Sequence, residues 1–408
     1  MKATYLFLGI ILFIACGYPP GAPVAWKSIE KDLQRKMITT SDSAVIEIPE
    51  GNFMFTRALL LDGKKHVTLR GAGVDKTILS FAMQEEGAEG LRVSYSEDIV
   101  LEDFTIQDAK GDNIKVTDTD GITFRRVKAE WTGEPKETNG AYAFYPVLSS
   151  NVVIEHCIAI GASDAGVYVG QSDSVVIRNN LVHHNVAGIE SENSRWVEIY
   201  GNETYQNTGG ILVFDLPGLT QSGHTTRVYS NKVYDNNYRN FAPEGNIVAS
   251  VPPGTGLMLL ATRNIEIFEN EIVDNKTLGI GVASYDLIQA VGGGESVGAS
   301  EVPEEQKADD YNAYYNNIYI HHNVIEDSHI FPTLKNDFGL LFLTKFPFST
   351  PDVVMDGILE DPDTFNFCMT ENGDATYANL DAGNAFEGLN TDIQKVDCLG
   401  QQIPPIFL

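Results

Sequence analysis

Apolar and polar residues alternate in short runs along most of this chain, and the runs return at a fixed spacing. A Gly–apolar–x–apolar segment begins at Gly90, Gly166, Gly188, Gly210, Gly256, Gly279 and Gly339, and the uninterrupted spacings are 22 or 23 residues. Alternation with period two is typical of β-strands, and a fixed repeat is typical of stacked units. No run in this region has the spacing of an amphipathic helix. The pattern therefore predicts a stack of short strands.

A second segment in each repeat ends on asparagine. These residues are Asn180, Asn202, Asn231, Asn270 and Asn323, with a further asparagine five residues later at 185, 207, 236 and 275 and Ser328 in the last copy. Asparagine tolerates left-handed turns, and its amide can bond to neighbouring backbone. We expect a hydrogen-bonded ladder, with Cys157 as a buried thiol one coil before Asn180. The fold expected is all-β: a single-stranded right-handed parallel β-helix.

The ends of the chain predict caps for this solenoid. Trp26, Ile29, Leu33 and Met37 have helical spacing, which favours an N-terminal cap helix over residues 24–38; membrane-surface binding is the alternative. The repeat fades after residue 345, where prolines become frequent. The expected organisation is a signal peptide (1–15), a tether and cap (16–40), the β-helix (41–345) and an irregular C-terminal cap (346–408).

The first coils resemble a known family. The order Val45–Gly51, Leu59–Leu61, Val67–Gly73 and Thr77–Leu79 is similar to the opening of secreted right-handed β-helix proteins, which include pectate lyases, alginate-modifying enzymes and carbohydrate-binding proteins. The resemblance extends over residues 44–345. It implies a polysaccharide or oligosaccharide partner and, for an enzyme, a polysaccharide lyase or glycoside hydrolase. One scaffold hosts many chemistries, so the reaction is not fixed by it.

The N-terminus predicts export and a lipid anchor. Lys2 precedes an apolar run, Tyr5–Ala15, that is too short to span a bilayer. Phe13-Ile14-Ala15-Cys16 resembles a bacterial lipobox, which implies a lipidated Cys16 and a place in the bacterial cell envelope, periplasmic or at the cell surface. An ordinary secretory signal is the alternative.

The net charge limits the classes of molecule that this chain can bind, and the cysteines allow one disulfide. The 28 basic residues face 56 acidic ones, a net charge of −28 that repels nucleic acid. Calcium binding is an alternative reading of the acidic surface, and the sequence identifies no metal ligands. In an oxidising compartment Cys368 could pair with Cys398, although sequence alone does not fix the pairing. A monomer is the default for a capped solenoid.

Aligning the glycines places two rows of side chains on one outer face. One row holds Tyr142, Tyr168, Glu190, Leu212 and Met258; the other holds Phe144, Gly170, Glu192, Phe214 and Leu260. Coils lie about 4.8 Å apart, so Tyr168 and Glu190 should be neighbours, with Asp215 just beyond the next strand. Rings can stack on sugars and carboxyls can transfer protons. We expect a shallow groove in which Tyr142, Tyr168 and Phe214 bind substrate while Glu190, Glu192 and Asp215 are catalytic.

Loops beside this face bring His224, Arg239 and Glu244 as further binding residues. The pairs His183-His184 and His321-His322 fit surface turns better than a metal site, because consecutive strand residues point in opposite directions. Alginate epimerases of similar fold carry an Asp-Pro-His core, but Tyr145-Pro146-Val147 stands at the nearest match here. The resemblance therefore disfavours an epimerase and leaves a lyase open, with Arg239 as its base.

The alternative to a carbohydrate-binding or carbohydrate-modifying protein is a non-catalytic scaffold. The insertions at 237–255 and 285–317 could present a binding surface to a protein partner on a non-catalytic scaffold. Converging carboxyls beside aromatic rings would favour an enzyme, whereas acidic side chains that point apart would favour the scaffold.

Overall fold

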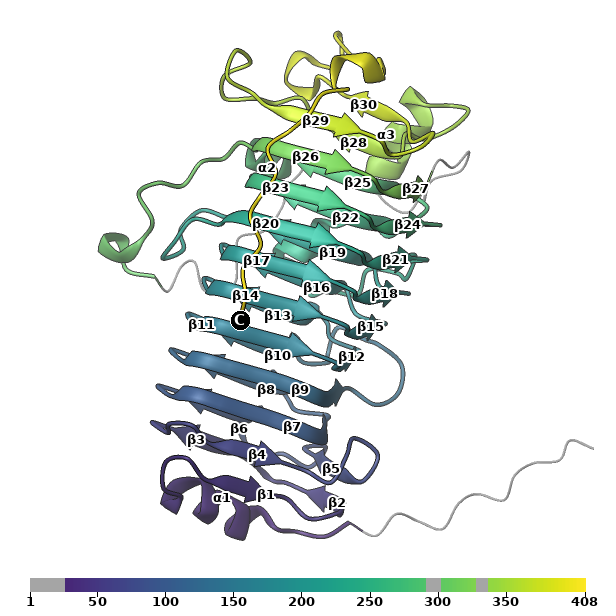
Figure 1. Ribbon diagram of the computed structural model, residues 1–408. Coiled ribbons are helices and arrows are strands. Elements are labelled where there is room, and N and C mark those ends of the chain that lie inside the picture. Colours follow the sequence, from purple (N-terminus) through teal and green to yellow (C-terminus); the bar gives the residue numbers. More distant parts are fainter. Residues whose placement is uncertain (1–25, 291–301, 328–336) are drawn as a thin grey trace, which may run out of the picture.

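The computed structural model describes residues 26–290, 302–327 and 337–408. These residues form an elongated right-handed coil of parallel strands with a helix at its N-terminal end (Figure 1). One face is an 11-stranded sheet, here called sheet B, and the other two faces form a 19-stranded sheet, here called sheet A. The predicted fold class is confirmed. Cys16 and the tether lie outside the described residues.

The strands follow one another around the coil in a regular order. Sheet B contains β3 (Arg57–Asp62), β6 (Glu86–Ser94), β8 (Ile114–Thr117), β10 (Tyr142–Val147), β13 (Ala165–Gly170), β16 (Ala187–Glu192), β19 (Gly209–Phe214), β22 (Thr255–Leu260), β25 (Leu278–Ala283), β28 (Val353–Met355) and β30 (Tyr377–Asn379). The first row of sheet A contains β1 (Val45–Glu47), β4 (Thr68–Arg70), β7 (Glu97–Gln107), β9 (Asp120–Glu130), β11 (Ser150–Glu155), β14 (Asp173–Arg178), β17 (Arg195–Tyr200), β20 (His224–Tyr229), β23 (Arg263–Phe268), β26 (Asn316–His321) and β29 (Phe367–Thr370). Its second row contains β2 (Gly51–Met54), β5 (Thr77–Ser80), β12 (Ile158–Ile160), β15 (Leu181–His183), β18 (Glu203–Tyr205), β21 (Lys232–Tyr234), β24 (Glu271–Val273) and β27 (Val324–Glu326), and the long strands β7 and β9 belong to both rows.

The interior of the coil is filled by one apolar residue above another. Ile189, Ile211, Leu257 and Ile280 are paired from strand to strand in sheet B, and all four are fully buried. Because side chains alternate between the two faces of a strand, the residues between them point outward from the coil. Each repeat of the sequence therefore contributes one layer of buried side chains to this core.

The asparagine ladder forms as expected. The Asn180 side-chain amide donates to Asn202 Oδ1 at 2.9 Å, and Asn202 donates to Asn231 at 3.0 Å. The Cys157 N–H donates to Asn180 Oδ1, and the thiol is free and buried. The second ladder runs through Asn185, Asn207, Asn236 and Asn275 and continues to Asp327. The expected last member, Ser328, lies outside the described residues.

Both caps differ in extent from the expectation. The N-terminal helix α1 (Glu30–Thr39) begins later than residue 24 and buries Leu33 and Met37 against the first coil. At the other end, β28, β29 and β30 continue the sheets to residue 379, so the coil extends beyond 345. The repeat expected at Gly339 is wrong, because that segment is helix α3 (Asp337–Lys345). A short uninterrupted apolar run is compatible with either a buried strand or a helix, so the sequence pattern could not distinguish the two here.

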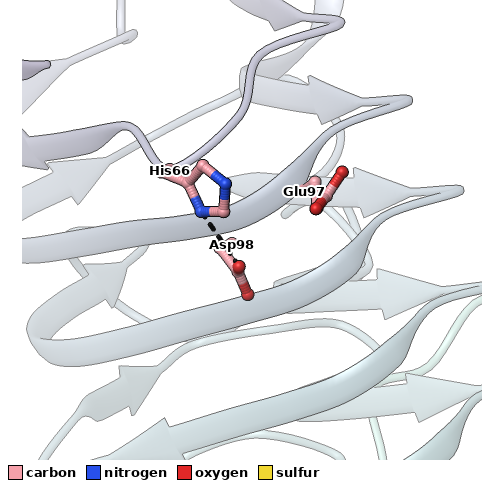
Figure 2. A group of neighbouring side chains, drawn as sticks. All are labelled: His66, Glu97 and Asp98. Atoms are coloured by element: carbon pink, nitrogen blue, oxygen red, sulfur yellow. Dashed lines mark ion pairs between the residues drawn. The ribbon is translucent and has the colours of Figure 1, made fainter. Parts of the chain in front are cut away.

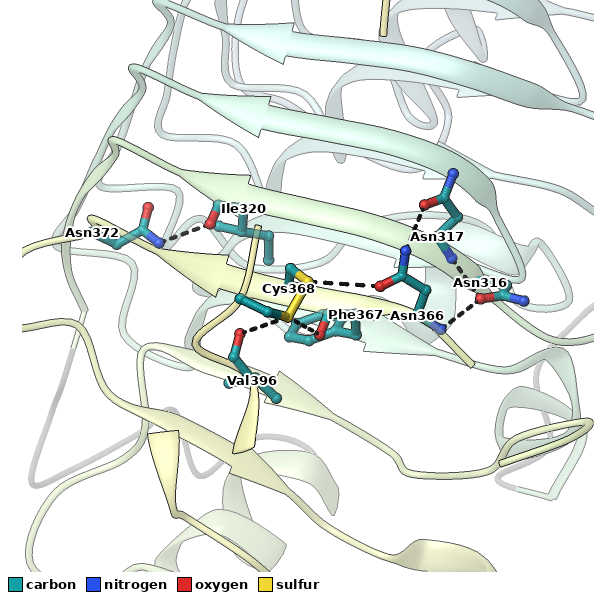
Figure 3. Close-up of a disulfide and its surroundings, with 9 residues drawn as sticks. Asn316, Asn317, Ile320, Asn366, Phe367, Cys368, Asn372 and Val396 are labelled. Carbon is teal, nitrogen blue, oxygen red and sulfur yellow. Dashed lines mark hydrogen bonds between the residues drawn. A yellow bond between two sulfur atoms is a disulfide. The ribbon is translucent and has the colours of Figure 1, made fainter. Parts of the chain in front are cut away.

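Cys368 and Cys398 form the predicted disulfide (Figure 3), which joins β29 to the C-terminal segment. Beyond it, the tail runs back along the outer side of sheet A (Figure 1). There the Ile403 N–H donates to Glu266 and the Ile406 N–H donates to Glu198. In the described part of the chain, the remaining helices are α2 (Tyr285–Ala290) and four single turns, at Ile247–Ser250, Glu304–Gln306, Ala382–Asn384 and Ile393–Lys395. Within the described residues, every helix is too short or too polar to cross a membrane.

Candidate functional site

The two predicted rows lie together on the outer side of sheet B. Tyr168 on β13 is paired with Glu190 on β16, and Glu190 is paired with Leu212 on β19. In the second row, Glu192 lies between Gly170 and Phe214. The strand register expected from the glycine spacing is therefore present from β13 onward. On β10 it is wrong: Tyr142 is paired with Ala165 instead of Tyr168, and Phe144 is paired with Val167 and lies in the interior core instead of on the outer face.

The rows do not form the expected open groove. Tyr142, Tyr168 and Phe214 are 2–3% exposed, Glu190 is 1% exposed and Asp215 is fully buried. Their cover consists of apolar residues from the inserted loops and α2, which pack on this face as a second hydrophobic cluster: Leu216, Leu219, Phe241, Ile247, Val248, Val251 and Ile288. The site is thus a covered cluster on the outer wall of the coil.

Three carboxyl groups and two tyrosine hydroxyls meet beneath this cover. Asp164, in the turn before β13, lies close enough to Glu190 for its charge to raise the pKa of the glutamate. The Tyr142 hydroxyl donates to Asp164 Oδ2 at 3.2 Å, and the Tyr168 hydroxyl donates to Glu192 Oε1 at 2.9 Å. Glu190 Oε2 is buried without a hydrogen-bond partner. Sequence reasoning missed Asp164, because it lies in a turn, just ahead of the Gly166 repeat.

Burial sets the protonation of this cluster. It raises the pKa of Asp164, with a further rise from the charge of Glu192, and it raises the pKa of Glu190 well above the usual range, helped by Asp164 and Glu192. Carboxylates this close resist ionising together, because each charge disfavours the next. The cluster therefore holds at least one proton near neutral pH, and it can supply a proton donor beside a proton acceptor.

On the N-terminal side of the cluster the side chains are only half-buried, and this partly exposed side is called the opening below. The half-buried Tyr145 has its ring centroid 4.4 Å from that of Tyr142 and 5.0 Å from that of Tyr168. Lys115 Nζ lies 4.7 Å from the Tyr145 ring centroid, and Arg92 is paired with Lys115 on the next strand. Arg92 Nε is buried without a hydrogen-bond partner. Neither basic residue was predicted: Lys115 lies in a coil without a repeat glycine, whereas Arg92 stands two residues after Gly90, in the row position of Tyr168 and Glu190.

A fourth carboxyl group lies at this opening. Asp112 is half-buried, and its Oδ1 accepts a hydrogen bond from the Tyr142 N–H at 3.3 Å. Burial raises the pKa of Asp112 to about 7, and the positive charge of Lys115 lowers it in part. Carboxyl groups therefore continue from the opening to the covered Asp164, Glu190 and Glu192.

The hydrogen bonds of the other predicted residues are made outside this cluster, although the charge of Glu192 still acts on Asp215. The Arg239 guanidinium donates to the Pro135 carbonyl at 2.9 Å and so joins loop 237–255 to loop 130–139. Glu244 is exposed on the same loop. Asp215 accepts a hydrogen bond from the Gly223 N–H, beside the half-buried His224. Burial raises the pKa of Asp215 to about 7. The Arg239 guanidinium therefore holds two inserted loops together.

One group of three residues in the described ranges has the spacing of a metal site. His66, Glu97 and Asp98 bring their ligand atoms within 4.8 Å of one another on an outer turn (Figure 2). His66 contacts Asp98 at 3.0 Å, while Glu97 already pairs with Lys65 at 2.5 Å. This exposed group has no buried, unpartnered ligand, and we assign it no metal.

The histidine pairs also have local partners. The two rings of His183 and His184 contact each other at 2.7 Å. His321 differs from the expected surface residue, because it is 5% exposed and bonds to Glu266.

Comparisons with known proteins agree with the fold. Residues 57–220 match the family model described as "Right handed beta helix region", which confirms the resemblance to right-handed parallel β-helix proteins. The search of curated proteins found no match to this chain.

Three solved structures are similar to this chain over most of its length, at low identity. The A-module of mannuronan C-5 epimerase AlgE4 from Azotobacter vinelandii is 14% identical, with 86% of this chain and 88% of that chain covered and a TM-score of 0.46. A DFA-IIIase from Arthrobacter chlorophenolicus is 11% identical, with coverages of 85% and 95% and a TM-score of 0.47. The alginate lyase AlyF-OU02 is 12% identical, with coverages of 87% and 82% and a TM-score of 0.39.

Proposed function

We propose that this protein binds and cleaves an acidic polysaccharide on the outer side of sheet B. The observation that carries the proposal is the convergence of Asp164, Glu190 and Glu192 with the hydroxyls of Tyr142 and Tyr168. Buried carboxyls with raised pKa values are typical of acid–base sites, and isolated ones are costly to keep in a merely structural wall. Convergence also favours an enzyme over a scaffold whose acidic residues point apart.

The basic residues at the opening favour an acidic sugar. Arg92 and Lys115 lie on neighbouring strands beside the ring of Tyr145, and Arg92 retains an unpartnered buried Nε. A guanidinium can hold a carboxylate through paired hydrogen bonds, and a tyrosine ring can pack on a sugar face. A uronate unit placed here would direct the next glycosidic bond toward Asp112 and Asp164.

Two reactions fit these groups. In a lyase, neutralising the uronate carboxylate makes the adjacent C–H acidic, an ionised carboxylate of the cluster removes that proton, and a protonated carboxyl donates to the leaving oxygen. In a hydrolase, one carboxyl protonates the glycosidic oxygen while a second activates water or attacks the sugar. Either requires loop 237–255 to move, because Asn246 on this loop contacts Asp164 Oδ2 at 3.4 Å.

Activity on acidic polymers tests this proposal. Polygalacturonate and alginate, each with its carboxyl-reduced form, are incubated with the protein, and the products are followed by ultraviolet absorbance and by reducing ends. Absorbing unsaturated products indicate a lyase, and reducing ends without absorbance indicate a hydrolase. Glu190→Gln should abolish turnover, whereas Glu271→Gln, at an exposed position on β24, should retain it. Equal activity of the two variants would overturn the assignment of Glu190.

We also propose that the protein is extracytoplasmic and anchored through a lipidated Cys16. The signal-like N-terminus supports export, and the Cys368–Cys398 disulfide is compatible with an oxidising compartment. Labelling of the expressed protein with a fatty-acid analogue tests the anchor. Label on the wild type and none on Cys16→Ser is the expected result, and label on neither contradicts it.

A further inference from the structure

We propose a second binding site, separate from the carboxyl cluster, for an oxyanion group such as a carboxylate, sulfate or phosphate. It is a cleft of about 310 Å³ where strands β20, β23 and β26 begin. The cleft is lined by His224, Thr225, Arg263, Asn264, Asp310, Asn316 and Asn317. None of Asp164, Glu190 and Glu192 lines it, so this site goes beyond the proposed function.

Arg263 provides the donors for an anion. Its Nε is buried without a hydrogen-bond partner, and its Nη2 donates only to the backbone carbonyl of Asp310 at 3.2 Å. On the neighbouring strand, Arg227 contacts two carboxylates, Glu198 at 2.9 Å and Glu266 at 3.3 Å. Among the described residues Arg263 forms no ion pair of this kind, although its charge acts on the carboxyls of Asp215 and Asp310. A bound oxyanion would complete its hydrogen bonding.

The acidic residue in the cleft is already engaged elsewhere. Asp310 Oδ1 accepts from the Ser222 hydroxyl at 2.7 Å, and its Oδ2 lies 3.8 Å from Arg195. Arg195 Nε in turn donates to the Ser222 carbonyl at 2.8 Å. This arrangement fixes the Asp310 carboxylate toward Ser222 and Arg195 and leaves the side of Arg263 available.

The surrounding charge favours an anion over a cation. Burial lowers the pKa of His224, and the positive charges of Arg195 and Arg263 lower it further. Asp310 and Asp173 oppose that effect only in part. The two guanidinium groups therefore outweigh the two carboxylates in their effect on the imidazole. A neutral His224 still has one N–H to donate.

The asparagines add polar contacts of known orientation. The Asn317 amide donates to Asn264 Oδ1 at 2.7 Å, and Asn316 Oδ1 accepts from the Asn317 and Asn366 N–H groups. These bonds hold the wall of the cleft across β23, β26 and the segment before β29. A rigid wall of amides beside a guanidinium suits a small group with several oxygen acceptors.

Isothermal titration calorimetry of the full chain tests this site. The ligands are sulfate, phosphate, galacturonate and galactose, and the proteins are wild type, Arg263→Gln, His224→Gln and Arg57→Gln. Arg57 is the control, because it is an exposed arginine already paired with Glu86. We expect an anion to bind the wild type and Arg57→Gln alike, about tenfold or more weakly to Arg263→Gln, and with an intermediate loss to His224→Gln.

The ligand arms identify the source of the oxyanion. Binding of galacturonate without sulfate or phosphate indicates a charged sugar, and binding of sulfate or phosphate indicates a free anion. Binding of galactose as tight as that of galacturonate would overturn the proposal. So would failure of every anion to bind the wild type, or equal affinities of Arg263→Gln and the wild type. These outcomes are independent of Glu190 and of polysaccharide cleavage.

Discussion

Tyr168 and Glu192 are 24 residues apart in sequence, and the tyrosine hydroxyl donates a 2.9 Å hydrogen bond to Oε1 of the glutamate. The two side chains are 3% and 2% exposed. Tyr168 lies on β13 and Glu192 at the end of β16, one coil later. One turn of the solenoid thus brings a carboxyl and a phenol together in the covered cluster.

Tyr168→Phe should destabilise the protein by about 1–3 kcal/mol, because it removes a donor from a buried carboxyl. The matched control is Tyr314→Phe, which loses a bond of the same length to Asp286 at the surface. Its expected effect is within about 0.5 kcal/mol. Urea unfolding of both variants measures the difference. Equal midpoints would show that the Tyr168 hydroxyl contributes nothing to stability.

Asn202→Ala should lower the free energy of unfolding by more than Tyr168→Phe does. Asn202 Oδ1 accepts from the Asn180 N–H and amide, and its own amide donates to the Ile177 carbonyl and to Asn231. Removing one ladder member leaves several buried groups unpaired, at a cost of about 3 kcal/mol or more. Asn384→Ala, at an exposed asparagine bonded to Asp381, is the control. Thermal unfolding that does not separate the two variants would contradict a stabilising ladder.

Stability should fall as the pH rises from about 5 to about 8. Asp112 and Asp215 have pKa values of about 7, against about 3.9 for an ordinary aspartate. A raised pKa means that the folded state holds the proton more tightly, so this stabilisation is complete below the unfolded pKa and is lost as the pH rises through 7. Urea midpoints across this range measure the slope.

Asp215→Asn isolates part of that slope. The substituted amide keeps an oxygen to accept from the Gly223 N–H and carries no charge. The variant should therefore lose less stability than the wild type between about pH 5 and pH 8. Identical slopes for the two proteins would mean that Asp215 does not titrate in this range.

Reduction of Cys368–Cys398 should cost about 3–4 kcal/mol, because the bond closes a loop of residues separated by 30 in sequence. The effect should be local: hydrogen exchange should rise in the C-terminal tail, including the Ile403 and Ile406 amides that bond to Glu266 and Glu198. The double variant Cys368→Ser/Cys398→Ser should exchange at one rate with or without reductant. A reductant effect on that variant would point to another cause.

The fold and the register could be predicted because each repeat of the sequence forms one turn of the coil. The glycines and asparagines mark each turn, and their spacing correctly pairs Tyr168 with Glu190 and Asn180 with Asn202. The limit is visible at Gly339, where an apolar run without alternation is helix α3. Whether such a run forms a strand or a helix depends on contacts with residues distant in sequence, and the spacing of the glycines contains no information about those contacts.

The site was only partly predictable for related reasons. Asp164 lies in a turn ahead of its repeat, and Lys115 lies in a coil without a repeat glycine, so alignment of glycines does not find them. Arg92 is different, because it stands two residues after Gly90, the row position of Tyr168 and Glu190, and the alignment could have included it. The closed cover was also missed. Phe241, Ile247 and Val251 in loop 237–255 carried that signal, because apolar residues in an insertion require a surface to pack against.

Affinity electrophoresis through gels containing polygalacturonate or alginate tests the central claim most directly, namely that the opening on sheet B is a glycan site. The proteins compared are wild type, Arg92→Gln/Lys115→Gln, and the control Lys31→Gln/Arg35→Gln on the exposed face of α1. We predict retardation of the wild type and the control in at least one acidic polymer, with loss of retardation for Arg92→Gln/Lys115→Gln. Equal retardation of all three proteins, or of none, would contradict the claim.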